Sequence, residues 1–261
     1  MDRSFLSQPS VIAASRSFVC IRLATYENEL EAAFLKSFRV TRSGEVENTV
    51  FSIMSPDGKQ SLVRASRSAR QTFSDAAAMA DSMRRIAKNY ESRAEGKPTM
   101  LPVVANVRLA IDVAACDNQP LVAIFAKDDA KRRVLESRIA ALAWSEKFIG
   151  RFVYVSEDNE KDLAAIASEK KDEGIFVVKA DTFGLNGTLL ARADVASTDA
   201  EFEKCLTAGL SRFSKASKQH HSHVRTGHEK GIFWETVMPV TDPMENQARA
   251  RGKREVSPPK R

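Results

Sequence analysis

The sequence predicts an α/β protein that contains two similar units followed by a basic C-terminal tail. Two observations carry this prediction. The order strand, helix, hairpin, helix occurs twice along the chain, and residues 214–261 hold most of the net charge of +6. A length of 261 residues fits one large domain or two small ones, and a hydrophobic content of 43% is sufficient for ordinary globular cores.

The first copy of this order is predicted within residues 1–96, after a short helix that ends near Ser15. An apolar strand, Phe18–Leu23, runs into the helix-forming stretch "ENELEAAFLKSF". Two β-rich runs then flank Pro56-Asp57-Gly58, which is a strong turn signal and predicts a hairpin. The copy closes with a helix for which Ser74 or Asp75 is the expected N-cap.

The second copy is predicted within residues 98–213. The stretch "FVYVSEDNEKDLAAIAS" supplies the strand and helix, Asn186-Gly187 marks the hairpin turn, and Thr198 or Asp199 starts the last helix. More structure precedes this copy than the first. A helix from Val103 to Ala115 and a buried strand from Leu121 to Ala126 lead into a long helix. The apolar residues of that helix recur at helical spacing: Val134, Leu135, Ile139, Leu142 and Ala143.

The order of elements in the second copy resembles that of the thioredoxin fold. The stretch "PLVAIFA" is similar to the family's strand that ends at the redox turn. The opening stretch "MDRSFLSQPSVIAASRSFVCIRL" is similar to the continuation of thioredoxin-like proteins with a W-C-x-x-C-x-x-M motif. The resemblance covers residues 1–213. It implies two thioredoxin-like units, each a mixed sheet flanked by helices, with the first unit incomplete.

The resemblance also implies that the leading strand and the redox motif of the first unit lie upstream of Met1. Either the start is internal to a longer gene, or the first unit is shortened and borrows a sheet edge from the second. In both cases Phe18–Leu23 is expected to be an exposed sheet edge through which chains associate. We expect a cytoplasmic protein if Met1 is the true start, and an exported one if the N-terminus is truncated.

The residues at the family's site positions differ from the family pattern. In the second unit the two cysteine positions fall on Asp129 and Arg132. The place of the family's cis-proline falls near Asn48 in the first unit and near Gly174 in the second. Asp128 and Asp129 are instead expected to favour the start of a helix. No catalytic residue is predicted, and the chain as given should have no dithiol activity.

Three functions stay open from the sequence. In complete form the protein would be a thiol-disulfide oxidoreductase or a redox sensor, as the resemblance implies. The alternative is a non-catalytic binding or scaffold protein. The cysteines Cys20, Cys116 and Cys205 form no C-x-x-C pair, and each is expected to be a small buried hydrophobic residue.

The third function is the handling of zinc or another transition metal by a histidine cluster. All four histidines, His220, His221, His223 and His228, fall within nine residues, and imidazole is a common ligand of such metals. In an extended segment, His221 and His223 would lie on the same side. The other interpretation is a polar linker, and no further cofactor is predicted.

The tail sequence "NQARARGKREVSPPKR" is predicted to be disordered because it has few large apolar residues. The preceding segment Ile232–Met238 is more apolar and is expected to pack on the chain's own body or to bind a protein partner. The body, Met1–Phe213, has a net charge of only +1, so no nucleic-acid partner is expected. No apolar run is long enough to predict a membrane span.

Overall fold

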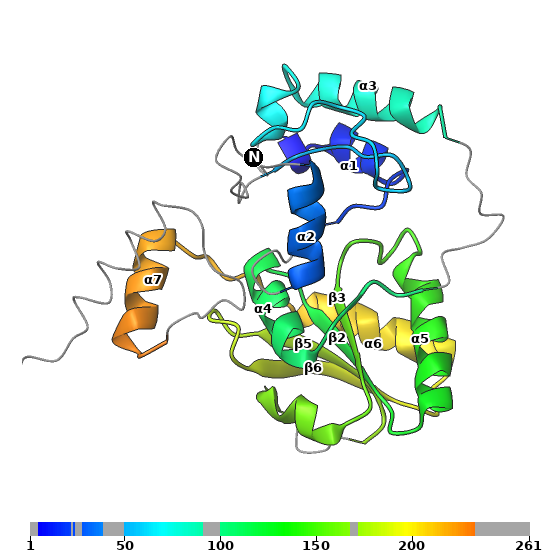
Figure 1. Cartoon of the computed structure of the whole chain (residues 1–261). Helices are drawn as coiled ribbons and strands as arrows, with labels where there is room; N and C mark the ends of the chain where they lie inside the picture. Colours follow the sequence, from blue (N-terminus) through cyan, green and yellow to red (C-terminus); the bar gives the residue numbers. More distant parts are fainter. Residues whose placement is uncertain are drawn as a thin grey trace, which may run out of the picture. The chain divides into compact units, whose positions relative to one another are not determined.

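The computed structural model describes residues 5–21, 23, 28–38, 50–90, 100–167 and 172–232. The chain divides into two compact units, one containing the described residues up to Tyr90 and the other those from Met100 to Ile232 (Figure 1). Residues 214–232 therefore belong to the second unit, whereas the sequence placed them in a separate C-terminal segment. The basic tail, most of Ile232–Met238 and Asn48 lie outside the described residues.

The second unit is built on a six-stranded mixed sheet in the order β1-β3-β2-β5-β6-β4. Strands β1, β3 and β2 are mutually parallel, β5 is antiparallel to both β2 and β6, and β4 is parallel to β6. The strands are β1 (Val103–Val104), β2 (Leu121–Phe125), β3 (Val153–Glu157), β4 (Ile166–Ala167), β5 (Gly174–Ala180) and β6 (Gly187–Asp194). The helices are α4 (Val107–Asp117), α5 (Asp129–Ala143), the 3-10 helix η3 (Glu160–Ala165), α6 (Asp199–Arg212) and α7 (His220–Glu229).

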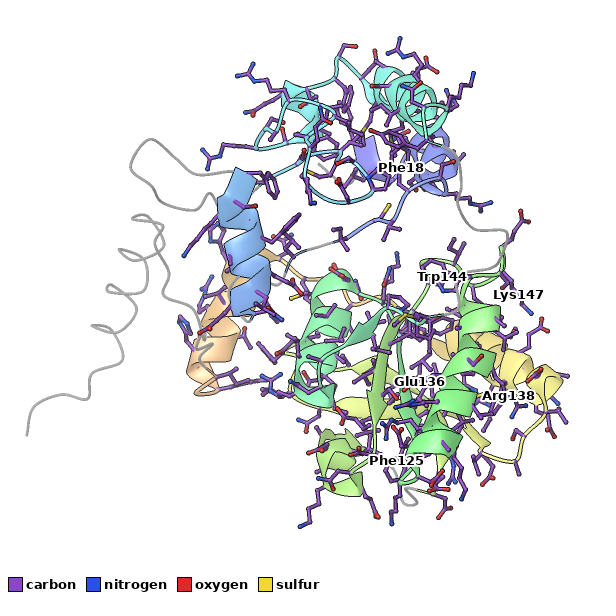
Figure 2. The ribbon with its side chains drawn as sticks, turned by 45° about the vertical axis from the view of Figure 1, so that its right-hand side comes forward. Phe18, Phe125, Glu136, Arg138, Trp144 and Lys147 are labelled. Carbon is purple, nitrogen blue, oxygen red and sulfur yellow. The ribbon has the colours of Figure 1, made fainter. Side chains whose placement is uncertain are left out.

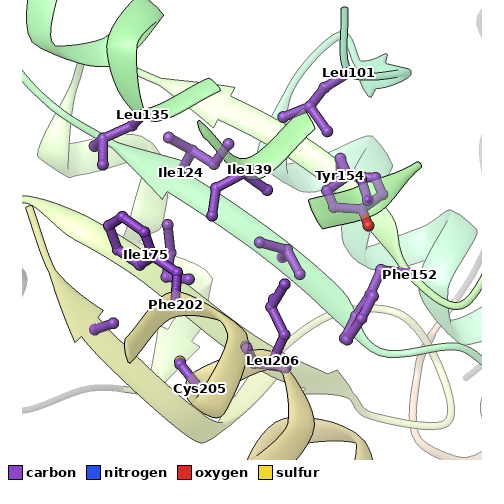
Figure 3. Close-up of a cluster of buried hydrophobic side chains, with 14 of the residues drawn as sticks. Leu101, Ile124, Leu135, Ile139, Phe152, Tyr154, Ile175, Phe202, Cys205 and Leu206 are labelled. Atoms are coloured by element: carbon purple, nitrogen blue, oxygen red, sulfur yellow. The ribbon is translucent and has the colours of Figure 1, made fainter. Parts of the chain in front are cut away.

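Helices cover both faces of this sheet, which explains why every residue of β2 is buried. Alternate residues of β2 point to opposite faces. Val122 and Ile124 pack with residues of α5 and α6 (Figure 3), whereas Leu121, Ala123 and Phe125 pack with residues of α4 and η3. The predicted run of buried residues is confirmed. The strand β2 is an interior strand of the sheet, between β3 and β5.

The start of α4 differs from the prediction. The sequence pattern indicated a helix from Val103, but Val103 and Val104 form the edge strand β1 and the helix begins at Val107. The N-cap is Asn106, whose side chain accepts the N–H of Leu109 at 2.9 Å. A short β-branched pair before a cap residue favours a strand followed by a helix, rather than one long helix.

The first unit has a small core but no sheet among its described residues. Its helices are α1 (Pro9–Ser15), α2 (Glu29–Phe38), the 3-10 helix η2 (Ala69–Gln71) and α3 (Ala76–Ala87). The buried side chains of its core are Phe5, Val11, Ala14, Ile53, Ala69, Met79, Ala80 and Met83. The predicted turn at Pro56-Asp57-Gly58 forms, but its flanks make only the isolated bridges Phe51–Ser66 and Met54–Ser61.

The predicted strand Phe18–Leu23 is wrong for the residues that the structure describes. Residues 18–21 and 23 lie in neither a helix nor a strand. Val19 is 83% exposed and Ile21 is 73% exposed. A strand needs a hydrogen-bonded neighbour, and this segment pairs with none of the described residues. The expectation of a sheet edge at this place is therefore not met.

The segment of residues 213–219 connects α6 to α7 and is hydrogen-bonded to the end of α4. Asn118, in the left-handed conformation with φ of 55°, exchanges two hydrogen bonds with the backbone of Ala216, at 2.7 and 2.9 Å. Lys218 Nζ donates to the carbonyl oxygen of Ala115 at 2.6 Å.

Among the helices that the structure describes, none has the length and apolar character needed to cross a bilayer.

We expect Asn118→Gly to lower the free energy of unfolding by about 1–2 kcal/mol, because two hydrogen bonds are lost while the left-handed backbone stays accessible. Asn118→Ala should cost about 1 kcal/mol more, because alanine disfavours that conformation. Urea unfolding of the full chain measures both values. If both substitutions lower the free energy of unfolding equally, the left-handed conformation at position 118 does not account for the extra cost expected of alanine.

Candidate binding site at the β2–α5 turn

The candidate site lies where the parallel strands β2 and β3 end and helix α5 begins. In open α/β sheets, ligands bind outside the carboxyl ends of the strands. An open cleft of about 750 Å³ lies here and is lined by Lys127, Asp158, Asn159, Glu160 and Lys161. Its residues follow β2 and β3 directly in sequence, so the ends of these strands position the cleft.

The start of α5 is fixed by a carboxylate, as the sequence predicted. Asp128 is the N-cap, and its side chain accepts the N–H of Lys131 at 2.8 Å. Asp129 is the first helical residue and adds a negative charge to the first turn. Both carboxylates lie at the positive end of the helix dipole, where a negative charge is stabilising.

Arg132 holds the first turn of α5 against the end of β3. Its side chain is 17% exposed and forms ion pairs with Asp129, with Asp158 at 3.3 Å and with Glu136 at 3.7 Å. Glu136 lies on the side of α5 that faces the strands (Figure 2), where its carboxylate accepts a hydrogen bond from the hydroxyl group of Ser156 on β3. The guanidinium of Arg132 is therefore bound by three carboxylates.

Glu157, the last residue of β3, is a further carboxylate at this edge of the sheet. Burial raises the pKa of Glu157 above its usual range, and the nearby charges of Asp162 and Asp158 act in the same direction. The hydrogen bond from the N–H of Val107, at 3.1 Å, opposes this shift. Glu157 thereby connects the end of β3 to the first turn of α4.

Glu173 closes the side of the turn that faces β5. One oxygen of its carboxylate accepts the backbone N–H of Lys127 at 3.0 Å, and the other lies 3.3 Å from Lys131 Nζ. Gly174 follows it and pairs with Phe125, the last residue of β2. The acidic side chain of Glu173 therefore accepts a hydrogen bond from a backbone donor just after the end of β2.

The backbone at Gly174 explains why proline is absent there. Gly174 has φ of +150°, and a Cβ atom built on it would lie 2.1 Å from the carbonyl oxygen of Ala193. Proline fixes φ near −65°, so it cannot adopt this conformation. The residue required at this position is glycine, for reasons of close backbone approach between β5 and β6.

The structure brings together most of the residues that the sequence singled out in the second unit. Asp129, Arg132 and the start of β5 at Gly174 surround the same turn, whereas Asn48 lies outside the described residues. The sequence analysis missed Glu157 and Glu173. The available signal was one acidic residue at the end of a predicted strand and another just before the next, but the contacts of both depend on how the strands pair.

The histidine cluster forms a helix and not an extended segment, which corrects the predicted geometry. In α7, His221 and His223 are separated by about 200° around the helix axis, so they lie on opposite sides. The ring of His223 stacks on Phe183 with centroids 4.6 Å apart. Within the described ranges, no three histidine, cysteine, aspartate or glutamate side chains are grouped so as to hold a metal ion.

The three cysteines have different environments, and none is at the β2–α5 turn. Cys205 lies on the buried face of α6, as predicted, and burial raises the pKa of its thiol to about 11. Cys20 and Cys116 are exposed, so their predicted burial is wrong. A thiol with a raised pKa is a poor nucleophile near neutral pH, which makes Cys205 unsuited to disulfide exchange.

No family model, no curated protein and no solved structure matches this chain.

Proposed function

We propose that residues 98–213 are a thioredoxin-like domain that acts as a non-catalytic binding module. The strand order β1-β3-β2-β5-β6 supports the fold assignment, because three parallel strands followed by an antiparallel hairpin are expected of that fold. The placement of α4 on one face, and of α5 and α6 on the other, agrees with it (Figure 1).

One observation supports the non-catalytic part of the proposal: the β2–α5 turn carries ion-paired charged side chains instead of thiols. Disulfide exchange needs a thiolate at a helix N-terminus and a second thiol to resolve the mixed disulfide. Here Asp129 and Arg132 stand at those places, and Arg132 is held by three carboxylates. Glu173 also covers the backbone of Lys127.

The cleft beside this turn favours a protein partner with charged side chains. It presents the carboxylates of Asp158 and Glu160 together with the ammonium groups of Lys127 and Lys161. Lys127 and Glu160 lie 3.3 Å apart and are both more than half exposed, so their ion pair is weak and is open to exchange. A ligand that carries both charge signs would replace these contacts with its own.

The absence of dithiol activity is tested by insulin reduction in the presence of dithiothreitol. We expect the chain to leave the uncatalysed rate unchanged, because no thiol lies at the start of α5. A matched variant with Cys20→Ser and Cys116→Ser should behave identically. An acceleration by the chain that this variant loses would contradict the proposal and would assign the activity to an exposed cysteine.

The binding part is tested by reversing charge in the cleft. Affinity capture from a lysate of the source cells is compared between the chain and the variant Asp158→Lys with Glu160→Lys. The matched control is Asp199→Lys with Glu203→Lys, which makes the same charge change on α6. We expect a partner whose recovery drops at least about tenfold with the cleft variant only. A partner lost equally with both variants would argue against this cleft.

A further inference from the structure

The hydroxyl group of Tyr154, near the start of β3, is buried without a hydrogen-bond partner. Tyr154 is only 4% exposed. Among the residues that the structure describes, its oxygen is the one buried side-chain oxygen or nitrogen atom that lacks such a partner. Burial also raises the pKa of this phenol, so the hydroxyl keeps its proton near neutral pH. Tyr154 therefore presents a neutral O–H donor that no group in the described part of the chain accepts.

The side chains around this hydroxyl are apolar. Tyr154 belongs to the buried cluster that includes residues of α5 and α6. Figure 3 shows Leu101 and Phe152 on either side of the Tyr154 ring. The ring centroids of Phe152 and Tyr154 are 6.1 Å apart, and Phe148 lies 6.0 Å beyond Phe152. A buried water molecule is held by about two to four polar partners, and these four side chains supply one. An apolar molecule that brings its own acceptor suits this place better than water.

The residues on either side of the ring come from segments outside the regular helices and strands. Leu101 precedes the edge strand β1, which has only two residues, and Met100 before it is 80% exposed. Phe152 ends the loop between α5 and β3. A hydrogen bond of 2.9 Å from Trp144 Nε1 to the carbonyl oxygen of Met100 joins the two segments. Loops and short edge strands open at a lower free energy than central strands do, so the surroundings of Tyr154 can open while β2 and α6 stay folded.

We propose that the region between Leu101 and Phe152 is a binding site for a small apolar molecule that carries a carbonyl oxygen. The molecule displaces Leu101, packs against Phe152 and accepts the hydrogen bond of the Tyr154 hydroxyl. Ligand sites are typically apolar with a few placed polar groups, and a buried donor discriminates against ligands that leave it unpaired. This site surrounds the start of β3, whereas the charged cleft follows the end of β3, so the two are independent.

The test compares acetophenone with ethylbenzene, which has nearly the same shape but a methylene group in place of the carbonyl group. Each compound is titrated into the isotope-labelled full chain near neutral pH, and its affinity is measured from the amide chemical shifts. We expect acetophenone to shift the signals of Leu101, Phe152 and Tyr154 and to bind at least about fivefold more tightly than ethylbenzene. Equal affinities, or no saturable shift at these residues, would overturn the proposal.

The variant Tyr154→Phe separates recognition by the hydroxyl from apolar packing. It should weaken acetophenone binding about fivefold or more and leave ethylbenzene binding unchanged. Because the hydroxyl has no partner among the described residues, its removal should not lower the urea concentration at which half of the chain unfolds. A preference for acetophenone that persists in this variant would show that another group accepts the carbonyl, and would refute the role of Tyr154.

A second variant, Leu101→Ala, tests which residue the ligand displaces. Removing most of the Leu101 side chain leaves space beside Tyr154, so both compounds should bind more tightly, by about threefold or more. The preference for acetophenone should remain, since the hydroxyl is unchanged. If the folded variant binds both compounds no better than the original chain does, Leu101 is not the residue that the ligand displaces and the proposed site is wrong.

Discussion

Replacing Gly174 by alanine should lower the free energy of unfolding of the second unit by roughly 3 kcal/mol or more. The φ of +150° at this residue is rarely adopted by residues with a side chain, and the added Cβ atom would meet the backbone oxygen of Ala193 at 2.1 Å. Backbone atoms of a paired strand cannot move aside without breaking the ladder between β5 and β6. The change should also displace Glu173 from Lys127, since it adjoins that contact.

Gly150→Ala is the matched control for this prediction. Gly150 also has a positive φ, of +68°, but a Cβ atom there would have nothing within 4 Å. Its cost should be limited to the backbone conformation, about 1 kcal/mol. Urea unfolding of the full chain, followed by far-UV circular dichroism, measures both variants. If the two cost the same, close backbone approach is not what requires glycine at position 174.

The elements of the second unit were largely predictable because their signals are local. The strand predicted at Leu121–Ala126 is β2, and two of the expected cap residues, Asp128 and Thr198, are the caps of α5 and α6. A run of apolar residues and a capping side chain both depend on residues that are close in sequence. They can therefore be interpreted without knowing which other segments pack against them.

The failure at Phe18–Leu23 has the opposite origin. An apolar run shows that a segment suits a sheet, but only a neighbouring strand can satisfy its backbone groups. The flanks of the turn at Pro56-Asp57-Gly58 show the same limit, because they make two isolated bridges instead of a ladder. Helices, which satisfy their own backbone, were predicted better in this unit, as α2 and α3 illustrate.

The conformation of α7 was not predictable from its own residues. Its sequence lacks a capping side chain and an acidic residue in the first turn, and its stacking contact with Phe183 comes from the distant β5–β6 hairpin. The candidate site is a mixed case. The capping role of Asp128 follows from the sequence, whereas the contact of Glu173 with Lys127 exists only because β2 pairs with β5.

Installing two cysteines at the β2–α5 turn should give the chain the disulfide-exchange activity that we do not expect it to have. The variant is Asp129→Cys with Arg132→Cys, made together with Cys20→Ser and Cys116→Ser so that no exposed thiol remains elsewhere. Residues three apart on a helix have Cα atoms about 5 Å apart, within the range that a disulfide spans. The N-terminus of α5 should stabilise the attacking thiolate.

The expected result is a reversible disulfide, seen as a loss of two free thiols, and insulin reduction at least about tenfold above the rate with dithiothreitol alone. The matched control is Val134→Cys with Ser137→Cys in the same background, which has the same spacing on exposed positions farther along α5. It lies beyond the first turn, where the dipole effect has faded, and should accelerate the reaction far less. Removing Arg132 also breaks its ion pairs with Asp158 and Glu136, so the fold of both variants is checked by circular dichroism first. The expectation fails if the two folded variants are equally active, or if the variant with cysteines at positions 129 and 132 is inactive. In either case the turn does not have the geometry of a thioredoxin-like redox site, and the proposed fold relationship loses its main functional support.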